Sequence, residues 1–232
     1  MKRSVVILLF LVAALSVWAQ PRLRQPEMYV GAHGGVLFSI VRFTPEIEGG
    51  RGIIDKTFLS GNGGLIFRYG GHKHCAVQVE LNYMQRGWRE NADKLTDVEE
   101  GSVHYTRKLD FLEMPFLAHI HFGKKVRFFI NLGPQIGVCV HESWSGTKHP
   151  VQQEQYQSLD RIFDWGVTGG LGLLVRTSKA GSFQLEGRFG YSFGDYFSNH
   201  KSDYFSTSNP MCLSVNVGYL WEIKPKQHAN IQ

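Results

Sequence analysis

The sequence has few cysteines, a small net charge and no long apolar run after its first twenty residues. Cys75, Cys139 and Cys212 lie far apart, so they form no paired zinc-binding pattern and their spacing decides no disulfide pairing. The chain also lacks a convincing helical period, a low-complexity tract and a linker. These absences favour one domain built from strands.

The N-terminus has the layout of a secretory signal peptide. Lys2 and Arg3 precede the apolar run Val5 to Val17, which is shorter than the roughly 20 residues of a transmembrane helix. Ala19 supplies a small residue at the cleavage position, so we predict a signal peptide over residues 1–19 and a mature chain that begins at Gln20.

The charge balance gives little support to a nucleic-acid partner. The formal net charge is +5, and it falls to +3 when residues 1–19 are removed. A nucleic-acid-binding protein would gather basic residues on one face, often with aromatic residues between them. Charged and apolar residues alternate along this chain instead, so we expect no nucleic-acid partner.

The clearest pattern lies in residues 109–140, where two amphipathic segments flank the turn Gly123-Lys124-Lys125. In the second segment the apolar positions are Val126, Phe128, Ile130, Leu132, Ile136, Val138 and Val140. The alternate positions are Arg127, Asn131, Gly133, Gln135, Gly137 and His141. A period of two is that of a β-strand, and both segments reach the roughly 9 to 11 residues with which a tilted strand crosses a bilayer.

The whole chain divides into eight such segments. We predict strands at Met28–Phe38, Phe58–Tyr69, Cys75–Arg86, Leu109–Phe122, Val126–Val140, Phe163–Arg176, Ser182–Gly194 and Met211–Ile223. Short turns alternate with the long connections 39–57, 87–108, 141–162 and 195–210. Outer-membrane barrels have this alternation, with short periplasmic turns and longer outer loops.

The two faces of each predicted strand also differ as a membrane barrel requires. In residues 182–194 the side chains expected to face lipid are Phe183, Leu185, Phe189, Tyr191 and Phe193, and those expected inside are Gln184, Glu186, Arg188, Gly190 and Ser192. We therefore predict an all-β fold, an eight-stranded antiparallel up-and-down transmembrane β-barrel. It would occupy residues 20–232, with strands over about 28–223, in the outer membrane of a Gram-negative cell after export through the periplasm.

Two features interrupt the pattern. Pro115 and Pro134 lie inside predicted strands, where each removes a hydrogen-bond donor, so we expect a bulge or local bend at both. The stretch Gly61-Asn62-Gly63-Gly64 is typical of a turn and would shorten its strand.

Several stretches resemble the PorT-like outer-membrane β-barrel proteins of Bacteroidetes. They are YVGAHGGVLF (29–38), VELNYMQRGW (79–88), LDFLEMPFLAHIHF (109–122), FFINLGPQIG (128–137), FDWGVTGGLGLL (163–174) and LEGRFGYSFG (185–194). Their order and spacing cover nearly the whole mature chain, and Pro115 and Pro134 fall within them. The resemblance implies an eight-stranded outer-membrane barrel, and it implies a role in protein export because the family's namesake is needed for type IX secretion.

Ten charged residues fall on the predicted interior face. They are Arg68, Glu80, Arg86, Glu113, Arg127, Asp164, Arg176, Glu186, Arg188 and Glu222. Eight strands enclose an interior just wide enough for side chains to fill, so we expect a network of ion pairs that plugs the lumen. The alternative is that the same residues line a narrow path for solutes.

Sites for chemistry are weakly indicated. His119 and His121 should both point inward, but no further ligand stands at a suitable spacing, so we predict no metal or cofactor. No nucleophile and base form a recognisable motif, so we predict no enzymatic activity.

The sequence thus favours a structural or interaction component that meets membrane lipid around its wall and protein partners through its loops or turns. Two alternatives are a small pore or transporter, and a secreted soluble barrel with an apolar ligand, whose faces would be inverted so that Phe183, Leu185 and Phe189 lie inside.

Overall fold

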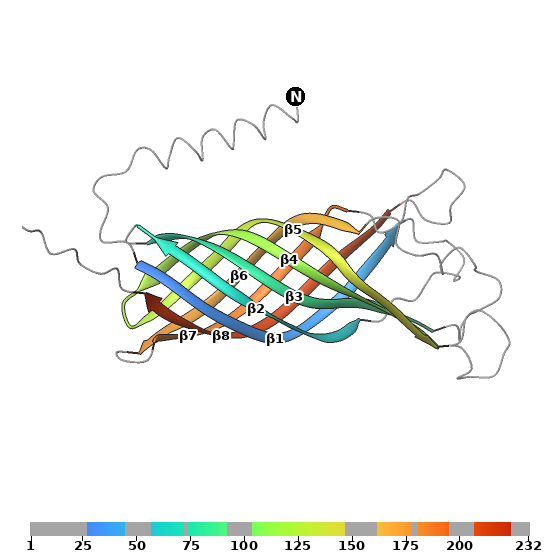
Figure 1. Cartoon of the computed structure of the whole chain (residues 1–232), viewed down its shortest axis with the longest axis horizontal. Coiled ribbons are helices and arrows are strands. Elements are labelled where there is room, and N and C mark those ends of the chain that lie inside the picture. Colours follow the sequence, from blue (N-terminus) through green and yellow to red (C-terminus); the bar gives the residue numbers. More distant parts are fainter. Residues whose placement is uncertain are drawn as a thin grey trace, which may run out of the picture.

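The computed structural model describes residues 27–44, 57–71, 74–91, 104–146, 162–177, 181–194 and 207–223. These residues form a closed barrel of antiparallel strands in which each strand pairs with its neighbours in sequence and β1 pairs with β8 (Figure 1). The strands are β1 (Glu27–Thr44), β2 (Phe58–Gly70), β3 (Cys75–Asn91), β4 (His104–Gly123), β5 (Val126–Gly146), β6 (Phe163–Thr177), β7 (Gly181–Ser192) and β8 (Thr207–Ile223). The predicted eight-stranded antiparallel barrel is confirmed. No helix in the described ranges is long and apolar enough to cross a membrane.

The two ends of the barrel differ. At one end the β2–β3, β4–β5 and β6–β7 connections are short, and both ends of the described chain, Glu27 and Ile223, lie there as well (Figure 1). We refer to this end as the short-turn end. The β4–β5 turn needs Gly123, whose φ of 109° is a conformation that residues with a Cβ rarely adopt. The predicted signal peptide with its cleavage site, and most of the long connections, lie outside the described residues.

Several strands extend beyond their predicted bounds at the opposite end. β3 and β4 remain paired up to Asn91 and His104, and β1 and β8 up to Thr44 and Thr207. The apolar alternation on which the prediction rested stops earlier, because charged residues such as Arg89, Glu90 and Arg107 follow in β3 and β4, and small polar residues begin β8. The backbone ladder continues without it, since neighbouring strands still exchange hydrogen bonds.

The faces of the barrel have the polarity of a membrane protein. The apolar side chains of Phe183 and Phe189 are 53% and 45% exposed on the outer wall, whereas the carboxylate-bearing Glu186 between them is 1% exposed inside. This arrangement contradicts the soluble-barrel alternative, which requires the large apolar residues inside. A small interior layer is apolar as well, and consists of Tyr29, Ile66, Phe129, Leu174 and Leu220.

Of the bulge or local bend that we predicted at Pro115 and Pro134, the register contains no bulge. Pro115 pairs with Gln135 and Pro134 pairs with Val167, and the β4–β5 register is the same on both sides of the prolines. A bulge requires an extra residue in one strand, whereas proline only removes a donor. The ladder therefore loses hydrogen bonds at these positions without changing its register.

The β4–β5 register shifts nearer the long-connection end. Asp110 pairs with His141 but Phe111 pairs with Cys139, so Val140 is the extra residue. This insertion reverses the inward and outward alternation beyond it. His141, which shares the parity of the inward-facing Arg127 and Asn131, is therefore exposed, and the next residue, Glu142, reaches the interior Arg107 instead.

The glycine-rich stretch of β2 also differs from its prediction. β2 runs unbroken from Phe58 to Gly70, and Gly64 pairs directly with Asn82 of β3. A Cβ at Gly64 would collide with the backbone of Leu81 and with Asn82. Glycine is therefore needed here for close approach between two strands, and not for a turn.

The outer wall generates a stability prediction. Val215 lies midway along β8 and is 46% exposed, and Ile223 on the same face ends the strand at the barrel rim. We expect Val215→Arg to reduce the free energy of unfolding by about 2 to 4 kcal/mol and Ile223→Arg by about 0 to 1 kcal/mol, because the cost of a charge facing lipid depends on depth. Denaturant unfolding in lipid vesicles measures both. Equal costs at the two positions would contradict the assigned lipid-facing wall.

Candidate functional site

The interior of the barrel carries the charged residues that the sequence pattern assigned to it. All ten lie on the inner face, and seven of them, Arg68, Glu80, Arg86, Glu113, Asp164, Glu186 and Arg188, are buried. Arg127, Arg176 and Glu222 are partly exposed near the short-turn end. The structure adds three charged residues that sequence reasoning missed, Glu27, Arg107 and Glu142. Glu27 and Arg107 each lie two residues before an inward-facing strand residue, Tyr29 and Leu109, and this spacing could have placed them inside. They were missed because Glu27 and Arg107 lie outside the predicted strand bounds.

The centre of the lumen is occupied by Arg188 of β7 and two carboxylates. Its Nη1 and Nη2 donate to the two oxygens of Glu80 on β3 at 2.6 and 2.7 Å. The same guanidinium donates to both oxygens of Glu186, at 2.9 and 3.1 Å. A guanidinium and a carboxylate that meet through two parallel bonds form one of the stronger polar contacts in proteins.

Arg68 of β2 joins this cluster through two glutamines. Its Nε donates to Gln78 and its Nη2 to Gln184, both at 2.7 Å. The amide of Gln78 in turn donates to Glu80, and that of Gln184 donates to Glu186 at 2.9 Å. The two amides therefore connect a second buried cation to the same pair of carboxylates.

Asparagine and histidine residues extend the cluster to the remaining walls. Asn131 of β5 donates to Glu186 at 2.9 Å and accepts from His119 Nδ1 of β4 at 2.7 Å. Asn82 of β3 donates to Glu80 at 2.8 Å and accepts from His33 Nε2 of β1 at 2.8 Å. Side chains from six strands thus meet in one hydrogen-bonded network, which we call the central network.

A second cluster lies nearer the long-connection end. Arg86 of β3 contacts Glu113 of β4, and its Nη1 lies 2.6 Å from Asp164 of β6. Ser192 donates to the same carboxylate at 2.7 Å, and the Arg86 guanidinium stands 4.8 Å from the ring centroid of Phe111. Beyond the bulge, Arg107 pairs with Glu142.

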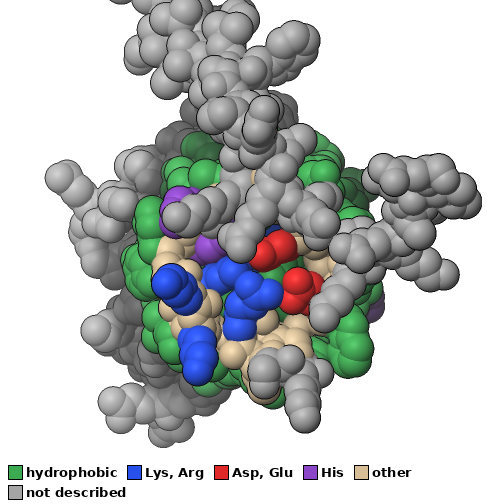
Figure 2. All heavy atoms as spheres, turned by 90° about the vertical axis from the view of Figure 1, so that its left-hand side faces the viewer, with side chains coloured by type: hydrophobic (Ala, Val, Ile, Leu, Met, Phe, Trp, Pro, Cys, Tyr) green, Lys and Arg blue, Asp and Glu red, His purple; other side chains and the backbone are tan. Residues whose placement is uncertain are grey.

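The short-turn end forms a charged mouth. Glu222 lies 2.8 Å from Arg176, and Glu27 lies 3.4 Å from Arg127 and 3.7 Å from Arg176. Figure 2 looks into this mouth and shows basic side chains gathered over it, with acidic side chains beside them. Of the predicted charges, only Arg68 has no ion pair with a carboxylate of the described residues.

The histidines contribute packing and hydrogen bonds to this interior. His119 and His121 both point inward, with ring centroids 5.3 Å apart, and His119 packs 5.0 Å from Phe129. His74 lies in the turn, 6.5 Å from His121 between centroids. In the described ranges no three His, Cys, Asp or Glu side chains are placed to hold a metal ion together.

Comparison with known proteins identifies the architecture. A family model described as an outer membrane protein β-barrel domain matches residues 18–198. Similar solved structures include Ail of Yersinia pestis, with 12% identity, a TM-score of 0.41, and coverage of 84% of this chain and 99% of that one. OprG of Pseudomonas aeruginosa has 11% identity, a TM-score of 0.48, and coverage of 86% and 97%. Outer membrane protein W of E. coli has 14% identity, a TM-score of 0.39, and coverage of 85% and 99%.

A search of curated proteins found no significant match. The match to the family model covers most of the chain and is the finding on which the assignment rests.

The central network generates a second stability prediction. Removing Arg188 strands Glu80 and Glu186 in the interior, so Arg188→Met should reduce the free energy of unfolding by about 3 to 5 kcal/mol. The matched change Arg176→Met removes a partly exposed cation at the mouth and should reduce the free energy of unfolding by about 0 to 1 kcal/mol. Reversible denaturant unfolding in detergent or lipid provides both values. Similar losses for the two variants would argue against a buried, interdependent cluster.

Proposed function

Because this chain belongs to the outer membrane protein β-barrel domain family, it lies in the outer membrane, and we propose that it works there as a non-enzymatic scaffold with a closed lumen. Membrane lipid surrounds its apolar wall. The short turns would face the periplasm and the long connections the cell exterior, as in other barrels of this class. The signal peptide over residues 1–19 would direct the chain into the periplasm.

One observation carries the closed-lumen proposal. Arg188 and Glu80 lie on β7 and β3, which are four strands apart in a ring of eight, and they bond directly. Arg127 and Glu27, on β5 and β1, approach each other across the mouth in the same way. Side chains that meet from opposite walls leave no continuous channel between them. The network supports a plug and argues against the pore alternative.

The scaffold would act by presentation. A barrel braced from inside holds its turns and connections in fixed positions, and loops on a rigid framework often carry binding function. The β4–β5 turn places Lys124 and Lys125 at the short-turn end, where they are exposed. We propose protein partners at these positions and, from the resemblance to PorT-like proteins, a role in protein export by a type IX route.

Conductance tests the plug. The mature chain in planar bilayers should give no stable current steps, because the central network blocks the lumen. The variant Arg86→Ala/Arg188→Ala removes two side chains that cross the interior and should produce channel openings. Its current steps also verify that the refolded barrel inserts into the bilayer. Discrete steps from the unmodified chain would mean that a continuous path exists, and would favour a pore for solutes.

Export is tested separately. Deletion of the gene in the source bacterium should reduce secretion of type IX cargo, and the unmodified gene should restore it. The unmodified barrel and the Arg176→Met variant should restore secretion equally, since that substitution leaves the plug in place. Normal secretion after deletion would overturn the export role, while the closed barrel in the membrane would stand.

A further inference from the structure

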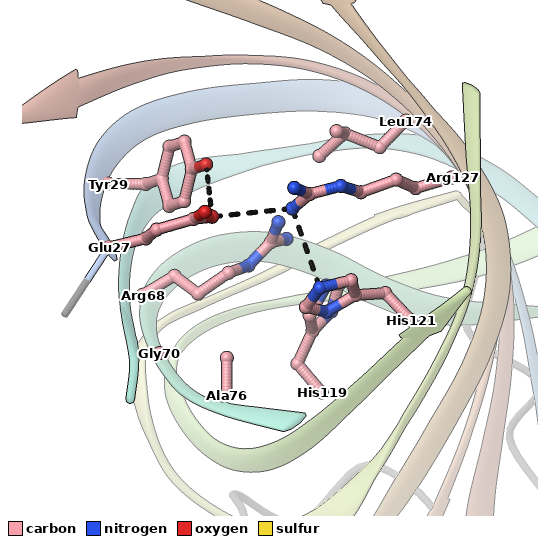
Figure 3. A pocket seen from close by; sticks show the side chains of 9 residues that line it. All are labelled: Glu27, Tyr29, Arg68, Gly70, Ala76, His119, His121, Arg127 and Leu174. Carbon is pink, nitrogen blue, oxygen red and sulfur yellow. Dashed lines mark hydrogen bonds and ion pairs between the residues drawn. The ribbon is translucent and has the colours of Figure 1, made fainter. Parts of the chain in front are cut away.

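A pocket opens at the short-turn mouth, below the central network. Its lining includes Glu27, Tyr29, Arg68, His121 and Arg127, which come from four strands and converge on one space (Figure 3). The cavity volume left free is about 20 Å³, so an entering group would have to take the place of a side chain that lines the pocket. It ends against side chains of the interior, so it is a vestibule and not a passage.

The pocket wall contains a buried cation without a carboxylate partner. Arg68 is only 3% exposed, and its hydrogen bonds go to the neutral amide oxygens of Gln78 and Gln184. No carboxylate of the described residues forms an ion pair with it. A guanidinium that lines a cavity in this way presents positive charge to whatever enters, and the effect is strong because little water screens it.

The carboxylate of Glu27 occupies the same space, and it is held loosely. Tyr29 donates to it at 2.8 Å, but Arg127 and Arg176 stand 3.4 and 3.7 Å away. Charge-assisted N–H to oxygen bonds are usually about 2.7 to 2.9 Å long. Arg127 also divides its contacts, because the same Nη1 lies 3.4 Å from His121 Nε2. Arg127 is therefore incompletely satisfied by Glu27, whereas Arg176 has a second carboxylate, that of Glu222, at 2.8 Å.

We propose that this vestibule binds the carboxylate group of an external ligand, and that Glu27 is its intramolecular occupant. The entering carboxylate would accept hydrogen bonds from Arg127 and Tyr29 and would lie in the field of Arg68. Displaced Glu27 would stay beside Arg176, which already faces it. Lys124 and Lys125 lie three and two residues before Arg127 in the exposed β4–β5 turn, where solvent screens their charge, so they would guide anions toward the rim without taking part in the site.

The geometry selects a carboxylate over a larger oxyanion. Tyr29 and Arg127 already surround the Glu27 carboxylate, which is planar and has two oxygens, and a planar guanidinium group matches that shape. The ligand would be a small organic acid, or the chain end of a peptide that reaches the mouth from the short-turn side. Since the vestibule is closed above, the ligand is bound there and not transported. This inference does not depend on the export role.

The test is a titration followed by nuclear magnetic resonance. The mature chain, refolded in detergent and labelled with ¹⁵N in arginine and histidine, is titrated with sodium acetate at constant ionic strength. The Nε–H signals of Arg68 and Arg127 and the ring signals of His121 should shift together and saturate. Glu27→Gln should lower the acetate dissociation constant by about five- to tenfold, because it removes the competing occupant. Arg127→Gln should abolish saturation.

Matched controls distinguish acetate binding in the vestibule from nonspecific attraction of acetate to positive charge. Lys124→Gln removes the same charge as Arg127→Gln from the exposed turn and should change the dissociation constant less than about twofold, since exposed charges are screened. A tripeptide with a free carboxyl end, compared with its amide, shows whether chain ends enter as acetate does. Heat-modifiable migration on gels verifies that each variant is folded.

Signals that fail to shift, or that drift linearly without saturation, would overturn the proposal. So would a Glu27→Gln variant that binds acetate no more tightly than the unmodified chain. Opposite effects from Glu27→Gln and Arg127→Gln cannot arise from general loss of structure, so that outcome would establish the site.

Discussion

The ion pair between Arg188 and Glu80 crosses the full width of the barrel, and the other polar side chains of the interior are arranged around it. An eight-stranded barrel has room inside for side chains only, and a charge held there requires partners because little water reaches it. Arg188 serves two carboxylates, and Gln78 and Gln184 connect those carboxylates to Arg68. Asn82 and Asn131 donate to the same carboxylates and accept from His33 and His119, so side chains from six strands are tied together through the interior.

Much of the fold could be predicted because lipid imposes one simple rule on the outer wall. Alternation in residues 126–140 and 182–194 identified both the strands and their faces. The bulge at Val140 could not be predicted in this way, because it is a relation between two strands and not a property of one. It turned His141 outward and brought Glu142 to Arg107. The alternation along a strand predicts whether a residue faces the interior, but its position along the barrel axis depends on the register between neighbouring strands. Sequence alone therefore did not predict which carboxylates meet Arg188, nor that Arg68 reaches Glu80 and Glu186 only through amides.

The interior combines a closed centre with an accessible mouth. Paired charges fill the middle of the lumen, and the apolar layer reaches the mouth, where Tyr29 and Leu174 line the pocket. At the short-turn end Glu27 is shared between two arginines at 3.4 and 3.7 Å, while Glu222 lies 2.8 Å from Arg176. The tightly bonded region resists opening, and the loosely bonded region can exchange partners without disturbing it. A rigid barrel with an adaptable mouth suits a protein that binds at its ends.

A double-mutant cycle on Arg188 and Glu80 tests the central claim most directly. Unfolding free energies of Arg188→Met, Glu80→Gln and the double variant would be measured in the same lipid or detergent. If the cross-barrel pair organises the interior, the double variant will lose less stability than the two single losses added together, with a coupling energy of about 1 to 3 kcal/mol. Additivity within about 0.5 kcal/mol would show that the two residues act independently, and would contradict the account of a lumen closed by paired charges.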